Sequence, residues 1–188
     1  FQARLHPEQR RSGIEALERE LEARIQKQVP VDQDKTILKF FLTFNKAILK
    51  TNFFMQDKRC LCYKLDPAVV SPTDYPEPVH ALLFFVGREF LGFHLRFRDI
   101  ARGGIRIVKS RHHTEYLHNL NTIFSENYQL AYTQQKKNKD IPEGGAKGTL
   151  LLHLANQEEE REAFVSYIDS MLDLLVPEKG VVCLLYTS

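Results

Sequence analysis

The spacing of apolar residues predicts a chain in which helices alternate with strands. Apolar positions recur every three or four residues, as in amphipathic helices, over residues 7–28, 32–54, 116–137 and a last segment that stops before position 177. Strand-sized apolar runs occupy Cys60–Leu65, Ala81–Val86, Phe90–Arg98 and Thr149–Leu154. This order predicts an α/β fold with a mixed sheet and helices packed on it. The apolar residues of the second helix nearly encircle it, which predicts burial on more than one side.

Two glycine-rich basic segments interrupt this pattern. The first reads Arg102-Gly103-Gly104-Ile105-Arg106, and the second runs from Pro142 to Gly148 and carries Lys147 directly before Gly148. Glycine allows unusual backbone angles and close approach to the main chain, so we expect the second segment to be a bend that displays Lys147. In the first segment, an arginine can hold a carboxylate through two parallel hydrogen bonds. Each segment alone is also compatible with an ordinary turn that carries solvated cations.

The second segment is not a nucleotide-binding P-loop. That motif requires Gly-x-x-x-x-Gly-Lys-Ser/Thr, whereas Lys147 lies between Ala146 and Gly148, and position 142 is a proline. A carboxylate or carbonyl ligand suits it better than a phosphate.

The composition of the chain bears on whether it binds nucleic acid, a membrane or a metal ion. The chain has 188 residues, 43% of them hydrophobic and 27% charged, and a formal net charge of +2. This charge is too small to indicate a nucleic-acid or membrane partner, and no apolar run approaches the ~18 residues of a membrane span. The spacing in Cys60-Leu61-Cys62 is too short for a zinc ribbon, so we expect both cysteines to be packing residues and predict no metal site.

The expected organisation has three parts. Residues 1–30 are expected to form an N-terminal helical segment, residues 31–182 an incomplete domain, and residues 183–188 a read-through tail. The sequence is therefore interpreted as a piece of a longer protein.

Taken together, the two glycine-rich segments resemble the substrate domain of glutamate dehydrogenases. The strings Phe97–Arg106 and Thr133–Gly145 are similar to the large-subunit, NAD-specific branch found in fungi and protists, and so is Phe44–Phe54. The resemblance covers roughly residues 30–182, and it implies that residues 31–182 are an incomplete substrate-binding and catalytic domain. It implies an NAD-dependent oxidoreductase that converts L-glutamate to 2-oxoglutarate and ammonium, with the dinucleotide-binding Rossmann domain missing from the sequence.

The resemblance also implies roles for individual residues. The lysine of Gly-Gly-x-Lys-Gly is the family's catalytic lysine, and that position is Lys147. The residue before the first Gly-Gly binds a substrate carboxylate, which makes Arg102 the counterpart here. The substrate-binding residues expected from the motifs are Arg102, Gly103, Gly104, Lys136, Lys137, Gly144 and Gly145. No cofactor-binding residue is expected within these 188 residues.

The sequence departs from the family pattern at one position. A family lysine twelve positions before the catalytic one holds the α-carboxylate, and that position is Gln135 here. Lys136 or Lys137 supplies the charge if the helix register shifts, and the sequence leaves the choice between them open. The family's catalytic aspartate is also absent, because its position lies beyond Gly180.

Two alternatives and several wider expectations accompany this interpretation. The chain is alternatively another amino-acid dehydrogenase, such as a leucine or phenylalanine enzyme, or a non-catalytic binder of anions or nucleic acid. The extra cations favour a substrate with a second carboxylate. From the family we expect L-glutamate and 2-oxoglutarate as ligands, no nucleic-acid or membrane partner, a homo-oligomer, and a location in the cytoplasm or the mitochondrial matrix.

Overall fold

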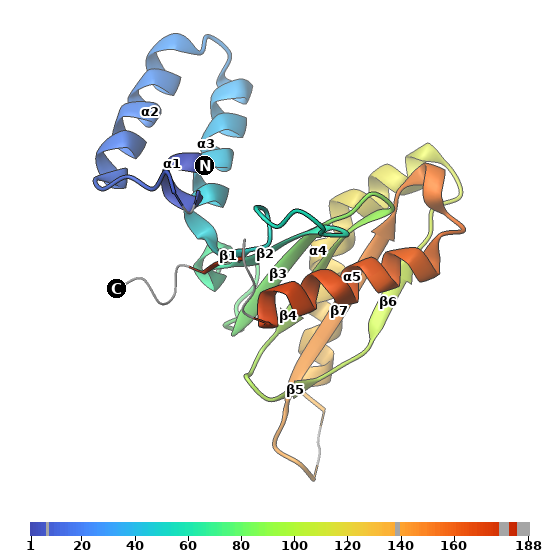
Figure 1. Ribbon diagram of the computed structural model, residues 1–188. Coiled ribbons are helices and arrows are strands. Elements are labelled where there is room, and N and C mark those ends of the chain that lie inside the picture. Colours follow the sequence, from blue (N-terminus) through green and yellow to red (C-terminus); the bar gives the residue numbers. More distant parts are fainter. Residues whose placement is uncertain (7, 138–139, 177–180, 184–188) are drawn as a thin grey trace. The chain divides into compact units, whose positions relative to one another are not determined.

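A computed structural model describes residues 1–6, 8–137, 140–176 and 181–183 of the chain. The chain divides into two compact units, Phe1–Ile48 and Leu49–Ser188 (Figure 1). The division predicted from the sequence, at residues 30 and 182, stays a prediction. Of the expected tail, residues 184–188 lie outside the described residues.

The first unit contains three helices: α1 (Gln2–Leu5), α2 (Ile14–Gln28) and α3 (Asp32–Ala47). Arg4 from α1 donates hydrogen bonds to the carbonyl oxygens of Lys46 and Ile48, at 2.7 and 2.9 Å, and so satisfies groups that the end of α3 leaves open. In this unit taken by itself, Phe40 and Phe41 are each 61% exposed, so the predicted burial of α3 on more than one side is not found there.

The expected second helix is shorter than the sequence suggested. It ends at Ala47, and strand β1 (Ile48–Thr51) follows at once. Lys50 and Thr51 of β1 pair with Cys183 and Val182 of strand β8 (Val182–Cys183). This pairing partner lies far along the chain, so a tertiary contact decides where the helix stops.

The second unit is built on a mixed sheet, as predicted. Its strands run in the order β5-β7-β4-β3-β2-β1-β8, and β6 also pairs with β7. The remaining strands are β2 (Leu61–Leu65), β3 (Ala81–Val86), β4 (Phe90–Arg96), β5 (Ala101–Arg102), β6 (Ile105–Val108) and β7 (Gly144–Leu152). β4 pairs with β7 in antiparallel fashion, whereas β5 and β6 pair with it in parallel. β7 is therefore the strand that joins the two parts of the sheet.

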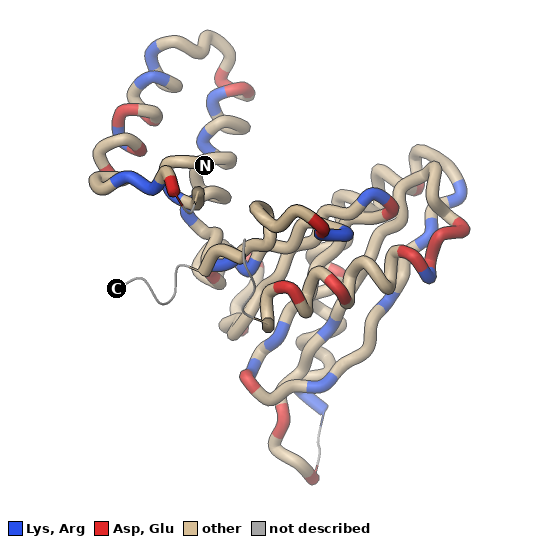
Figure 2. Tube along the Cα trace, in the orientation of Figure 1, with Lys and Arg blue, Asp and Glu red and all other residues tan. Residues whose placement is uncertain are grey.

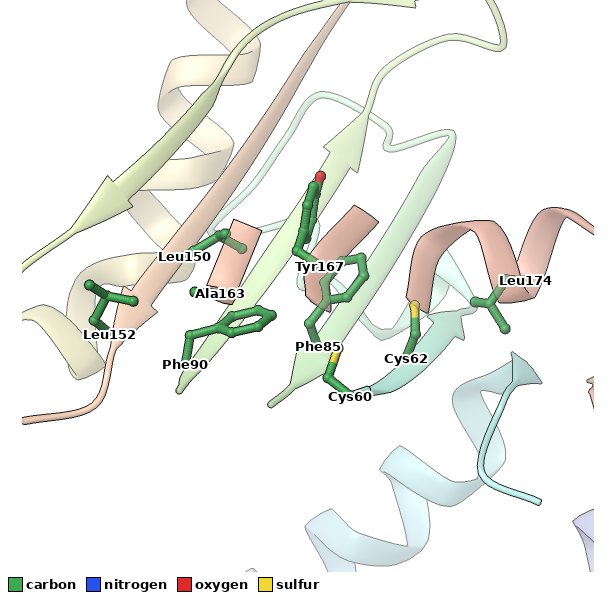
Figure 3. Close-up of a cluster of buried hydrophobic side chains, with 9 residues drawn as sticks. All are labelled: Cys60, Cys62, Phe85, Phe90, Leu150, Leu152, Ala163, Tyr167 and Leu174. Carbon is green, nitrogen blue, oxygen red and sulfur yellow. The ribbon is translucent and has the colours of Figure 1, made fainter. Parts of the chain in front are cut away.

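Helices α4 (His113–Gln135) and α5 (Glu160–Leu175) cover opposite faces of this sheet (Figure 1). On the α4 face, Leu151 packs with Val108 and Ile123. On the α5 face, Phe85, Phe90 and Leu150 of the sheet pack against Tyr167 (Figure 3). Neighbouring residues of β7 point to opposite faces, so every second residue packs in the same layer. Two short 3₁₀ helices, Pro67–Val69 and Leu154–Asn156, complete the described elements.

The predicted bend around Lys147 is wrong in one respect. Strand β7 begins at Gly144, five residues earlier than expected, so Gly144, Gly145, Lys147 and Gly148 lie within a strand. Among the described residues, the one glycine with a positive φ is Gly13. The glycines of β7 are therefore not needed for unusual backbone angles. They are needed for close approach, because neighbouring atoms occupy the space that a side chain would fill.

Candidate functional site

The site forms where the strand beside β7 is interrupted. Arg102 of β5 pairs with Gly145, and Ile105 of β6 pairs with Gly148, so Gly103 and Gly104 lie opposite Ala146 and Lys147. A Cβ on Gly103 would overlap the carbonyl oxygen of Ala146. The two main chains thus touch at Gly103, and no other residue type fits that position without a shift of the backbone.

A small cavity of about 150 Å³ lies beside this interruption. It is lined by Gly103, Gly104, Leu130, Thr133, Gln134, Lys137, Ala146 and Lys147. The lining residues come from three places: the gap between β5 and β6, the end of α4, and β7. The structure therefore brings together the two glycine-rich segments that the sequence singled out, and it adds one face of α4.

Lys147 is the half-buried residue at the strand side of this cavity. It pairs with Leu95 of β4, whose neighbours Phe93 and Phe97 contact aromatic rings of α4. Lys147 consequently lies on the α4 face of the sheet. A Cβ on Gly104 would lie 3.7 Å from the Lys147 Nζ, so the amine lies directly over the Gly103–Gly104 segment.

Arg102 lies next to the cavity but does not line it. Its pairing with Gly145, two positions before Lys147, gives it the same face of the sheet as Lys147. The Arg102 side chain is 53% exposed, and its Nε forms an ion pair with Glu143, whose side chain is 16% exposed. Arg102 and Glu143 thereby link β5 to the residue that precedes β7.

The structure separates the two lysines that the sequence could not tell apart. Lys137 lines the cavity. Lys136 instead forms a 3.0 Å ion pair with Glu77, and its Nζ lies 5.0 Å from the centre of the Tyr132 ring. The adjacent residues point to different surroundings because they lie at the end of α4, where consecutive side chains are about 100° apart around the helix axis.

Gly144 and Gly145 are buried and do not line the cavity. A Cβ on Gly144 would lie 2.7 Å from the Cβ of Arg98, and one on Gly145 would overlap the Ala131 carbonyl oxygen of α4. The Gly145 N–H donates to the Gln135 Oε1 at 2.7 Å. Gln135, which stands where the family pattern has a lysine, thus fixes α4 against β7. The second Gly-Gly pair is a packing contact that brings the end of the helix onto the strand.

Sequence reasoning missed several residues of the site. Leu130, Thr133 and Gln134 line the cavity together with Lys137. Their spacing of three and four residues is the signal that could have placed them on one helix face. Deeper on the same face, Thr149 donates a 3.0 Å hydrogen bond to Asn127, and both side chains are fully buried.

The opposite face of β7 has a different chemistry. His94 Nδ1 lies 2.5 Å from the hydroxyl oxygen of Tyr167, and that hydroxyl would lie 2.8 Å from a Cβ on Gly148. Burial, with a smaller effect of the Arg96 charge, lowers the pKa of His94 to about 4. Burial also raises the pKa of the Cys60 thiol to about 12. Cys60 and Cys62 are buried packing residues, as predicted.

Charge and metal-binding groups do not point to another kind of site. Lys and Arg positions are frequent along residues 96–111 and Asp and Glu positions along α5, so the second unit carries charges of both signs (Figure 2). Within the described ranges, no three His, Cys, Asp or Glu side chains gather as a metal site would require. None of the helices in those ranges is both long and apolar enough to cross a bilayer.

Comparison with known proteins gives one matching family and several similar proteins. The family described as "Bacterial NAD-glutamate dehydrogenase, catalytic domain" matches residues 20–176. Glutamate dehydrogenase 2 of Dictyostelium discoideum is 50% identical over 163 residues, which cover 87% of this chain and 16% of that protein. The NAD-specific glutamate dehydrogenase of Neurospora crassa is 50% identical over 156 residues, which cover 83% and 15%. A protein of the same name from Halomonas elongata is 32% identical over 141 residues, covering 72% and 8%. The chain thus spans about a sixth of the length of the first two relatives.

Proposed function

Because the chain belongs to the NAD-glutamate dehydrogenase family, we propose that the complete protein oxidatively deaminates L-glutamate to 2-oxoglutarate and ammonium, with hydride transfer to NAD. The family expected from the two glycine-rich segments is confirmed. The function itself rests on the names of relatives that are about six times longer than this chain.

Within that enzyme, this chain supplies the substrate pocket. The observation that carries this proposal is the cavity of about 150 Å³ in which Lys137 and Lys147 come together with the backbone of Gly103 and Gly104. Pockets for drug-sized ligands typically measure about 300–1,000 Å³. The cavity therefore suits a small acid and does not fit a dinucleotide. NAD is accordingly assigned to a Rossmann domain outside these 188 residues.

The charges of the pocket suit a dicarboxylate. L-Glutamate and 2-oxoglutarate each carry two carboxylate groups, and Lys137 offers an ammonium group to one of them. Arg102 remains a substrate-binding residue in this proposal: its Nε pairs with Glu143, but a guanidinium has five N–H donors and can hold a second carboxylate. Lys136 is not assigned a substrate contact, because Glu77 already holds it. A leucine or phenylalanine dehydrogenase would need an apolar side-chain pocket at this place.

Lys147 is assigned the catalytic role that the family motif implies. Oxidation of the amino acid leaves an imine, which water must attack to give the keto acid and ammonium. An amine beside the reacting carbon can remove a proton from that water and return it to the leaving nitrogen. The half-buried position of Lys147 over Gly104 suits this role, because the main chain there has no side chain between the amine and the substrate.

The wider expectations are part of the same proposal. The enzyme works as a homo-oligomer in the cytoplasm or the mitochondrial matrix, without a nucleic-acid or membrane partner. The small formal net charge of +2 supports the absence of a nucleic-acid partner, since nucleic-acid-binding domains are usually strongly basic.

Replacement of Lys147 by alanine in the complete enzyme tests the catalytic assignment. Loss of a general acid–base group typically lowers the rate about 10²–10⁴-fold, so we expect kcat for glutamate oxidation to fall by that order. Lys109→Ala is the matched control, since Lys109 forms surface ion pairs with Glu158 and Glu160 away from the cavity. Turnover of Lys147→Ala near the level of the control would refute the assignment.

A further inference from the structure

The last turns of α4 present two different faces. Leu130, Thr133, Gln134 and Lys137 face the cavity. Tyr128, Tyr132 and Lys136 follow one another at intervals of four residues and so lie on a second face. The rotation of α4 about its axis decides which of the two adjacent lysines enters the cavity. What fixes that rotation is therefore important for the substrate site.

The second face of α4 is attached to the segment that precedes β3. The Tyr128 hydroxyl accepts a hydrogen bond from the Glu77 N–H at 2.8 Å and donates one to the Glu77 carbonyl oxygen at 3.1 Å. One turn earlier, the Tyr75 and Ser125 hydroxyl oxygens are 2.6 Å apart. Two turns after Tyr128, Lys136 reaches the Glu77 carboxylate at 3.0 Å. Glu77 thus contacts α4 through both its main chain and its side chain.

The main-chain part of this attachment is rigid. Tyr128 is 2% exposed, and its ring lies 5.3 Å from the Phe97 ring, centre to centre. The Phe97 N–H donates to the Gly145 carbonyl oxygen at 3.0 Å. Glu77 is therefore held against the same strand that carries Lys147, two residues beyond Gly145. From this segment the Glu77 carboxylate reaches Lys136, the residue after the last helical position of α4, Gln135, which is itself bonded to β7.

Lys136 is the residue at which α4 ends, and Lys137 follows it outside the helix. A residue beyond a helix end has no intrahelical hydrogen bond to hold it. We propose that Glu77 is a positioning residue: by pairing with Lys136 it fixes the end of α4 and so holds Lys137 in the substrate cavity. The same pair keeps the charge of Lys136 out of the cavity. This inference rests on the proposed function.

A double-mutant cycle in the complete enzyme tests the proposal. Exposed ion pairs contribute only a small free energy, so Glu77→Gln is expected to raise KM for glutamate by no more than about fivefold, with kcat changed little. Lys136→Ala should have the same effect, and Lys136→Arg, which keeps the pair, should stay near the parent. In the Lys137→Ala background, Glu77→Gln should raise KM no further, because the residue it positions is gone.

The controls separate this proposal from the proposed function. Asp169→Asn removes a similar 2.8 Å surface pair, with Arg59, on the other face of the sheet and should leave KM unchanged. Thermal unfolding shows whether any variant has lost its fold. If Glu77→Gln leaves KM unchanged, or raises it equally with and without Lys137, the positioning role is refuted while the pocket assignment stands. If Lys137→Ala and Lys147→Ala both retain parent kinetics, the pocket assignment itself fails.

Discussion

The two faces of strand β7 are made from alternate residues of one short sequence, yet they differ in character. Lys147 and Thr149 face α4, where a cavity lined by polar and charged groups lies beside Gly103 and Gly104. Gly148 and Leu150 face α5, where Tyr167 and the cysteines fill the space (Figure 3). The difference shows how a strand can present a lysine side chain to a cavity on one side while packing on the other side holds the strand in place.

From this comparison we expect substitutions on the two faces of β7 to have different effects. Changes on the α5 face should lower the free energy of unfolding and leave KM unchanged in the molecules that fold. Changes of the half-exposed or exposed side chains that border the cavity on the α4 face, such as Lys147 and Arg102, should alter KM or kcat and leave stability nearly unchanged. The expected effects below run from the largest to the smallest.

The largest expected effect comes from the first Gly-Gly pair, which offers a matched comparison. Gly103→Ala places a Cβ on the carbonyl oxygen of Ala146, so the backbone must shift and stability should fall by about 3 kcal/mol or more. Gly104→Ala places its Cβ 3.7 Å from the Lys147 Nζ, an ordinary contact distance. Denaturant unfolding should separate the two variants. Equal stability of both would contradict the close approach of the main chains at Gly103.

Leu150→Ala tests the α5 face. Leu150 is fully buried, and loss of a buried leucine side chain typically costs about 2–5 kcal/mol. We expect a fall in stability of about 3 kcal/mol, with KM for glutamate within twofold of the parent at a temperature where the protein is folded. A large change in KM without a change in the unfolding curve would contradict the view that the α5 face contributes to stability and the α4 face to substrate binding.

A pH titration tests the His94–Tyr167 contact. Because the pKa of His94 is lowered to about 4 from an unfolded value of about 6.5, the folded state binds fewer protons between these values. The corresponding stability is fully present above about pH 6.5 and is lost as pH falls towards about 4, by about 3 kcal/mol. His94→Gln should remove this dependence of the unfolding free energy on pH, which is measured from urea unfolding curves at several pH values. If the unfolding free energy of the variant depends on pH as that of the parent does, His94 is not buried in its neutral form.

The smallest expected effect is that of Arg102. Arg102→Gln removes a half-exposed cation from the border of the cavity, so KM for glutamate should rise by a factor of about three to ten. Stability should change by less than about 1 kcal/mol, as for other exposed ion pairs. If KM stays at the parent value, Arg102 is a link to Glu143 and not a substrate ligand.

The sequence predicted much of the fold because apolar spacing is a local signal. Ala81–Val86 forms β3 as expected, and α4 differs from its predicted range by a few residues at each end. The start of β7 was misjudged because proline and glycine normally mark turns. Gly144 and Gly145 lack side chains because Arg98 and α4 pack directly against the strand there. This is a contact between distant parts of the chain, which a local sequence pattern does not indicate.

The site was predicted less completely than the fold. The motifs identified Lys147 and the Gly103–Gly104 pair, which do lie together at the cavity. They could not choose between Lys136 and Lys137, because the choice depends on the rotation of α4, and Tyr128 and Glu77 fix that rotation through tertiary contacts. The ion-pair partner of Arg102 could not be predicted from the sequence either, because the parallel pairing of β5 with β7 brings Glu143 beside it.

A crystal structure of the complete enzyme with bound 2-oxoglutarate tests the central claim most directly. The account predicts the keto acid in the cavity between α4 and β7, with one carboxylate about 2.7–2.9 Å from the Lys137 Nζ, as in other charge-assisted hydrogen bonds, and the keto carbon beside the Lys147 amine. A ligand bound elsewhere, with Lys137 and Lys147 both out of contact, would contradict it.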